Sequence, residues 1–234
     1  MTDAAKDTSM KYEPIQPRHL SHDLRGPLKS ILGFTELLLD GFEGPLNEIQ
    51  IEDISAIQQS AKDLLELINH MVDWSKLEAN QLKLRLGPEA LDEIINHLVA
   101  DSTVTNLKLT SEMPDKIPLV EVDRQRVEHL LSHLIAFLQA HSASQIEIQI
   151  LAESQAVITR VTAPKVSLTP QQQAELFEAT AAVDLAGRSK LTTGGLSLPL
   201  AAKLAASQNG QLYAVSGSTT GLTFVLSLPV LGTQ

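Results

Sequence analysis

Apolar residues recur at helical spacing in a first stretch of the chain, from about Pro17 to Asp40. At about 100° per residue, one sector of this helix is almost wholly apolar. That sector holds Leu20, Leu24, Leu28, Ile31, Thr35 and Leu38. The opposite sector is polar and holds His22, Arg25, Lys29, Gly33, Glu36 and Asp40. The pattern predicts a helix that buries its leucines and displays His22 to solvent.

A second helix is expected from about Asn47 to Asn80, after a glycine- and proline-containing turn at 41–45. Its seam alternates spacings of three and four residues, as heptads do. The seam comprises Ile51, Ile54, Gln58, Ala61, Leu65, Ile68, Val72 and Ser75, and is widened by Ile57, Leu64 and Met71. Because one hairpin of two such helices leaves apolar surface uncovered, we expect a homodimer with a four-helix bundle. An obligate interface of this kind buries on the order of 2,000 Å² or more.

Beyond Asn80 the pattern changes to short strands and helices, which is typical of a two-layer α/β sandwich. Strands are expected at 81–86, 106–111, 119–122, 145–150, 156–161, 211–216 and 221–228. Helices are expected from Pro88 to about Ser102, from a cap at Asp123 to about His141, and at 170–182 and 196–207. The fold class is therefore α plus α/β. Its parts are a flexible tail at 1–13, a helical hairpin domain at 14–80 and an α/β domain at 81–231.

Composition narrows the classes of function. The net charge is −10 and no cluster of Lys and Arg stands out, so we expect no nucleic-acid surface. No run approaches the roughly 18 apolar residues of a membrane span, and the polar N-terminus lacks the apolar core of a signal peptide. The chain has no cysteine, which fits a reducing cytoplasm and excludes thiolate chemistry.

The segment His22-Asp23-Leu24-Arg25-Gly26-Pro27 resembles the phosphoacceptor motif of bacterial sensor histidine kinases. The hairpin resembles their dimerisation and histidine-phosphotransfer domain. The stretch at 74–79 resembles the junction into their ATP-binding domain, and 195–229 resembles the last helix and strands of that domain. The resemblance spans about residues 14 to 230. It implies the histidine-kinase type of α/β sandwich for the second domain.

An exposed imidazole with an ordinary pKa of about 6.5 is largely neutral at pH 7 and is therefore nucleophilic. The resemblance implies that His22 accepts the phosphoryl group and that Asp23 orients the ring or takes its proton. Arg25, Lys29 and Glu36 lie on the same face and are expected to contact the partner, the receiver domain of a response regulator.

The second domain departs from the family. The helix after Asp123 carries Phe137 at the position of the family's magnesium-chelating asparagine, and a phenyl ring offers no oxygen to a hard cation. The segment at 161–167 stands where an aspartate followed by glycines should bind adenine, and it has neither an acid nor a glycine. Only Gly194-Gly195 remains near the phosphate-covering loop. We therefore expect a degenerate domain without cofactor or metal, because phosphoryl transfer from ATP needs the metal and phosphates in place.

Three functions remain open. A histidine phosphotransferase would exchange a phosphoryl group between receiver domains through His22. A pseudokinase would dock a response regulator or another kinase without chemistry. A working histidine kinase would need an unusual nucleotide site.

The pair His129 and His133 has a spacing that can bind metal, but leucines surround it and no third ligand is evident, so a structural role is favoured.

Overall fold

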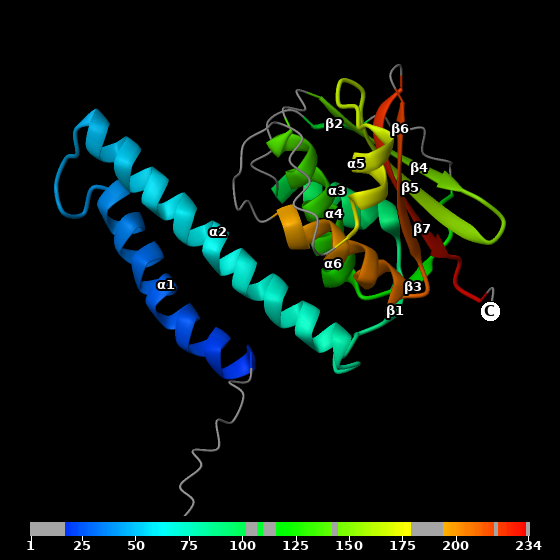
Figure 1. Cartoon of the computed structure of the whole chain (residues 1–234), viewed down its shortest axis with the longest axis horizontal. Coiled ribbons are helices and arrows are strands. Elements are labelled where there is room, and N and C mark those ends of the chain that lie inside the picture. The colour runs from blue at the N-terminus through cyan, green and yellow to red at the C-terminus, as the bar shows by residue number, and fades with distance from the viewer. Residues whose placement is uncertain are drawn as a thin grey trace, which may run out of the picture. The chain divides into compact units, whose positions relative to one another are not determined.

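A computed structural model describes residues 17–101, 107–109, 116–141, 145–178, 194–217 and 220–232 (Figure 1). The predicted tail at 1–13 lies outside these residues. The side chains at 17–20, 22, 101, 107–109 and 194–195 are likewise not described. Contacts divide the chain into two units, Met1–Ser75 and Lys76–Gln234.

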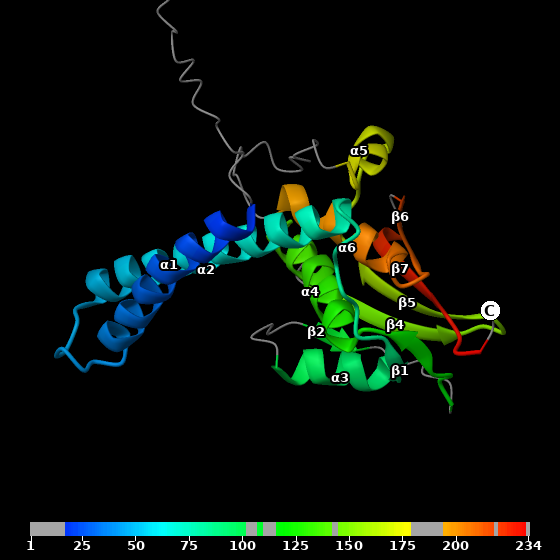
Figure 2. The same ribbon diagram turned by 90° about the horizontal axis from the view of Figure 1, so that it is seen from below.

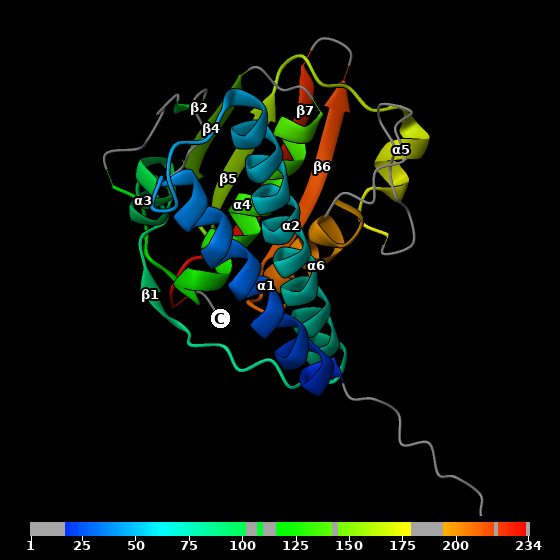
Figure 3. The same ribbon diagram turned by 90° about the vertical axis from the view of Figure 1, so that its left-hand side faces the viewer.

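The first unit is the predicted helical hairpin. Helix α1 (Pro17–Leu39) and helix α2 (Glu48–Glu78) run side by side in opposite directions (Figure 3). Helix α1 ends because Gly41 adopts a positive φ of 77°, and the N–H of Phe42 donates to the carbonyl of Leu37. Helix α2 begins with a reciprocal cap, in which the side chains of Asn47 and Gln50 accept from each other's backbone N–H at 2.9 Å.

The core of the hairpin is small. Leu28, Ala61 and Ile68 are buried, and Leu32 and Leu65 pack against them. Other members of the predicted apolar sector are more open than expected, with Leu24 exposed by 41% and Ile31 by 40%. One partner helix covers only part of a sector that wide, which explains the difference.

The second unit contains a five-stranded sheet in the order β2-β4-β5-β7-β6. The strands are β2 (Leu107–Leu109), β4 (Ile146–Ala152), β5 (Ala156–Ala163), β6 (Gln211–Gly217) and β7 (Gly221–Pro229). Strand β2 pairs parallel to β4, and the other neighbours are antiparallel. A separate two-stranded sheet joins β1 (Gly87–Glu89) to β3 (Val120–Val122). The expected pairs at 145–150 with 156–161 and 211–216 with 221–228 are confirmed.

Helices form the second layer of this unit (Figure 2). They are α3 (Leu91–Asp101), α4 (Arg124–Ala140), α5 (Pro170–Glu175) and α6 (Gly194–Ala206). Helix α4 packs against α6, α3 and β5, and α6 also packs against β6. Apolar side chains from the helix-facing side of β4, β5 and β7 are buried, among them Ile148, Val161 and Phe224. The predicted two-layer α/β sandwich is confirmed.

Three sequence-based expectations differ from the structure. Residues 81–86 form no strand, and the N–H of Arg85 instead donates to the Asp123 carboxylate at 2.8 Å. The next helix begins at Leu91 rather than Pro88, because 87–89 pairs with β3. Helix α5 ends at Glu175, and the remainder of the predicted helix from 179 lies outside the described residues. Alternating polarity at 81–86 thus reflects half-burial of Leu82 and Leu84 without a strand partner.

No helix in the described part of the chain combines the length and apolar character needed to cross a membrane.

Candidate functional site

The predicted phosphoacceptor position lies on α1. His22 has a helical backbone there, and its side chain lies outside the described residues. Asp23 follows it and is exposed. At about 100° per residue, Arg25, Lys29 and Glu36 lie on the same face of the helix as His22. Lys29 and Glu36 are exposed, whereas Arg25 is half-buried. Helix α1 therefore presents all the predicted site positions except Asp23 on one face.

The side chain of Arg25 is hydrogen-bonded to helix α2. Its Nε and Nη2 atoms both donate to Oδ1 of Asn69 on α2, at 3.2 and 2.8 Å. The two residues are 44 positions apart in sequence. Asn69 was not among the residues predicted to form the site, because nothing in the pattern of α2 distinguishes it from other exposed polar residues.

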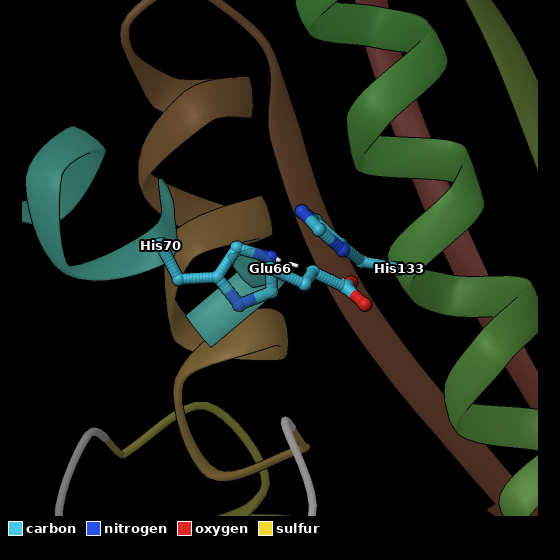
Figure 4. A group of neighbouring side chains, drawn as sticks. All are labelled: Glu66, His70 and His133. Carbon is cyan, nitrogen blue, oxygen red and sulfur yellow. Dashed lines mark ion pairs between the residues drawn. The ribbon is translucent and has the colours of Figure 1, made fainter. Parts of the chain in front are cut away.

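A second polar pair follows on α2. Figure 4 shows Glu66 and His70, one helical turn apart, with the His70 Nε2 atom 3.5 Å from a Glu66 carboxylate oxygen. The i, i+4 spacing is the signal that sequence analysis could have used. The pair is an ion pair only when the imidazole is protonated. Together with Asn69, it makes this part of α2 more polar than the heptad seam suggested.

In the second unit, Phe137 lies in an aromatic cluster. Its side chain is only 5% exposed. Its ring stacks at a tilt on the imidazole of His141, with centroids 4.2 Å apart, and meets Phe224 edge to face at 5.7 Å. Phe177 contacts Phe224 edge to face, with the two ring centroids 6.3 Å apart. The sequence pattern did not single out these residues. Phe177 and Phe224 come from parts of the chain distant from Phe137, whereas His141 lies one turn after it, at the C-cap of α4.

The segment at 161–167 begins in the sheet, because β5 ends at Ala163. Val161 and Ala163 are fully buried on the helix-facing side of β5. Thr162 lies between them and therefore points to the opposite side, where its hydroxyl hydrogen-bonds the hydroxyl of Thr223 at 3.0 Å. The backbone of β7 also approaches closely, since a Cβ added at Gly221 would lie 2.3 Å from the Ala163 carbonyl oxygen.

These residues do not fit a magnesium–nucleotide complex. The ring of Phe137 has no atom that coordinates a hard cation, and it is packed against other rings. Thr162 faces away from the helices, and no residue of 161–167 carries a carboxylate. Gly194 and Gly195 form the first residues of α6, and the neighbouring segment at 179–193 lies outside the described residues. The residues at the positions expected to bind metal and purine, Phe137 and the segment at 161–167, therefore contact other parts of the second unit instead.

The histidine pair on α4 is divided between two environments. His129 is exposed, whereas His133 is 8% exposed and counts among the buried polar residues. Leucines 130, 131 and 134 of the same helix are fully buried.

Comparison with known proteins relates both units to signalling proteins. Residues 18–80 match the His Kinase A (phospho-acceptor) domain. The chain is 28% identical over 218 residues to the circadian input-output histidine kinase CikA of Synechococcus elongatus. The aligned region covers 90% of this chain and 29% of CikA. The chain thus spans less than a third of the length of this curated relative.

Solved structures show the same fold. Full-length ShkA in complex with AMPPNP has a TM-score of 0.68 at 22% identity, over 93% of this chain and 46% of ShkA. The histidine kinase ThkA, in complex with the response regulator protein TrrA, has a TM-score of 0.57 at 15% identity, over 91% of this chain and 60% of ThkA. The helical hairpin followed by the α/β unit is the fold that these kinases share.

Proposed function

Because this chain belongs to the two-component histidine kinase family, we propose that it is a histidine phosphotransferase. It accepts a phosphoryl group at His22 from one receiver domain and donates it to another, and it does not draw that group from ATP. The observation that carries the proposal is the burial of Phe137 in an aromatic cluster, at the position matched to a magnesium ligand.

The transfer step needs only side chains of the first unit. The phosphorus–oxygen bond of an aspartyl phosphate breaks, a bond from phosphorus to an imidazole nitrogen of His22 forms, and the aspartate leaves as a carboxylate. The imidazole proton passes to Asp23 or to solvent. Because phosphoryl transfer depends on positioning and on stabilising charge, cationic groups near His22 are the chain's main contribution.

The partner in this proposal is a response-regulator receiver domain. The ThkA structure contains its response regulator TrrA, which is a precedent for the same fold. Arg25, Lys29 and Glu36 share the face of α1 that carries His22, and they are the residues proposed to contact the receiver. Electrostatic complementarity of such a face speeds association more than it strengthens binding.

The proposed assembly is a homodimer through the hairpin. Apolar side chains of α2 lie open on one face, with Ile57 exposed by 52%, Leu64 by 47% and Met71 by 54%. An open groove of about 620 Å³ lies in the hairpin and includes Leu28, Ile31 and Leu64 in its lining. Exposed apolar side chains that share one face in this way support the proposal that this face is the dimer interface.

The decisive experiment incubates the protein with a receiver domain that has been phosphorylated with acetyl phosphate. Phosphoryl label should appear on the wild-type protein and be absent from His22→Gln. A calorimetric titration with ATP and Mg²⁺ should show no binding. Tight receiver binding that transfers no label, and that His22→Ala leaves unchanged, would support a docking pseudokinase instead. ATP binding followed by self-phosphorylation would replace the proposal with a working kinase.

A further inference from the structure

We propose that Asn69 is a positioning residue, which holds the Arg25 guanidinium next to the phosphoacceptor turn of α1 so that Arg25 binds the oxygens of the phosphoryl group that His22 accepts. This inference rests on the proposed function of His22. It assigns a role to a residue of α2 that lies outside the phosphoacceptor motif.

The hydrogen bonds leave most of the guanidinium available. Asn69 Oδ1 accepts one N–H from Nε and one from Nη2 of Arg25. A guanidinium carries five N–H donors, so three remain for another acceptor. Fixing one edge of this planar group orients the remaining donors, and a phosphoryl group suits them because Arg binds phosphate oxygens through two parallel bonds.

The placement along α1 brings Arg25 within reach of His22. The two residues are three positions apart on a helix, and Cβ atoms at that spacing lie about 5–6 Å apart. Arg25 is half-buried against α2 rather than extended into solvent. The side chain is therefore ordered before a phosphoryl group arrives, and less conformational entropy is lost when it binds.

The chemistry of Asn69 suits this role better than a carboxylate would. An amide oxygen accepts hydrogen bonds but carries no net charge. It therefore orients the guanidinium without neutralising it, and the full positive charge remains for the phosphoryl oxygens. Aspartate at this position would form an ion pair with Arg25 and would repel an incoming phosphate.

A purely structural bond between the helices is the alternative. The hairpin already has a core formed by Leu28, Ala61 and Ile68, with Leu32 and Leu65 packed against it. A bond that served only to join α1 to α2 would be retained by Asn69→Asp, because a carboxylate accepts the same two N–H groups. The two explanations therefore make opposite predictions for that variant.

The test measures phosphoryl transfer from a phosphorylated receiver to wild type, Asn69→Ala, Asn69→Asp and Arg25→Lys. We expect each variant to lower the transfer rate at saturating receiver about tenfold, because each loses an orienting hydrogen bond or the free charge of Arg25. The unfolding midpoint of Asn69→Asp should match that of wild type. Wild-type transfer by Asn69→Asp would overturn the inference and leave the proposed function standing.

A matched control lies on the same helix. Gln59 donates a side-chain hydrogen bond to Asp63 at 2.8 Å, within α2. Gln59→Ala removes a comparable exposed bond that does not involve α1, and its transfer rate should equal that of wild type.

A second arm of the test does not need a receiver. Phosphoramidate is a small anionic donor: its phosphorus–nitrogen bond breaks, a bond to the imidazole nitrogen forms, and ammonia leaves with the imidazole proton. Because the chain has 7 histidines, His22→Gln supplies the background to subtract. Labelling of His22 should be slower in Asn69→Ala than in wild type, and equal rates would overturn the inference. If no receiver transfers label, the proposed function fails while this arm still tests Asn69.

Discussion

Phe137 and Phe224 meet edge to face with their ring centroids 5.7 Å apart, so that α4 is joined to β7 by two aromatic side chains. Edge-to-face pairs are favourable because the positive edge of one ring meets the negative face of the other. The position that resembles the family's metal ligand is thus part of an apolar core. A second unit built in this way is folded by its own packing and does not rely on a nucleotide to join these two elements.

The first prediction concerns the stability of this cluster. Phe137→Ala should lower the free energy of unfolding by about 3 kcal/mol or more, because it removes a buried ring and leaves a cavity. Urea denaturation followed by circular dichroism measures the change. Gln139→Ala, on the exposed side of the same helix, should stay within about 0.5 kcal/mol of wild type. Equal stability of all three proteins would contradict the packing described for Phe137.

The second prediction concerns nucleotide binding. Phe137→Asn restores the residue type of the family's magnesium ligand at one position, but Thr162 remains bonded to Thr223 on the far side of the sheet. We therefore expect no calorimetric signal when ATP and Mg²⁺ are titrated into this variant. Measurable binding by Phe137→Asn, but not by wild type, would show that Phe137 alone blocks the site.

The third prediction separates backbone strain from crowding. Gly221 and Gly232 both adopt positive φ, at 75° and 89°. A Cβ at Gly221 would collide with the backbone of Ala163 and Pro164, whereas a Cβ at Gly232 meets nothing within 4 Å. Gly232→Ala should cost about 1 kcal/mol from the backbone alone, and Gly221→Ala should cost clearly more. Equal unfolding midpoints for the two variants would contradict the close approach of β5 and β7.

The fourth prediction concerns Asp123. Its carboxylate accepts from the N–H of Arg126 at 3.2 Å, which caps α4, and from the N–H of Arg85 at 2.8 Å. Asp123→Ala should lower the free energy of unfolding by about 2 kcal/mol, since the Arg85 N–H loses this acceptor and the Arg126 N–H loses the side-chain cap, keeping its 3.0 Å bond to the carbonyl of residue 123. Asp123→Asn keeps one carbonyl oxygen and should lose less. The comparison is made by chemical denaturation, and an unchanged Asp123→Ala would show that solvent replaces both bonds.

The fifth prediction tests the proposed homodimer. Leu64→Glu places a charge in the middle of the exposed apolar face of α2, so the dimer should dissociate at concentrations where wild type remains associated. Sedimentation equilibrium measures the change. Ser55→Glu adds the same charge at an exposed position outside the apolar seam and should leave the mass unchanged. A monomeric wild-type protein would refute the proposed assembly.

Local patterns predicted much of the fold. The N-cap at Asp123 and the helix that follows it were predicted from residue type and periodicity, and both are present. The hairpin turn follows from glycine, because the positive φ at Gly41 is a backbone preference that needs no tertiary partner. The segment at 81–86 was predicted wrongly, since alternation shows which side chains are half-buried but not whether a neighbouring strand exists to pair with.

The sequence alone determined which residue types occupy the phosphoacceptor turn and which types are missing at 137 and 161–167, because a missing functional group is evident without coordinates. Only the tertiary structure decided what those residues do instead. The ring of Phe137 meets Phe224, which in turn meets Phe177, and these residues are distant in sequence. Arg25 likewise hydrogen-bonds Asn69, 44 positions away. Such pairs depend on how helices and strands pack, and a periodic pattern specifies the buried face of an element but not the partner that it meets there.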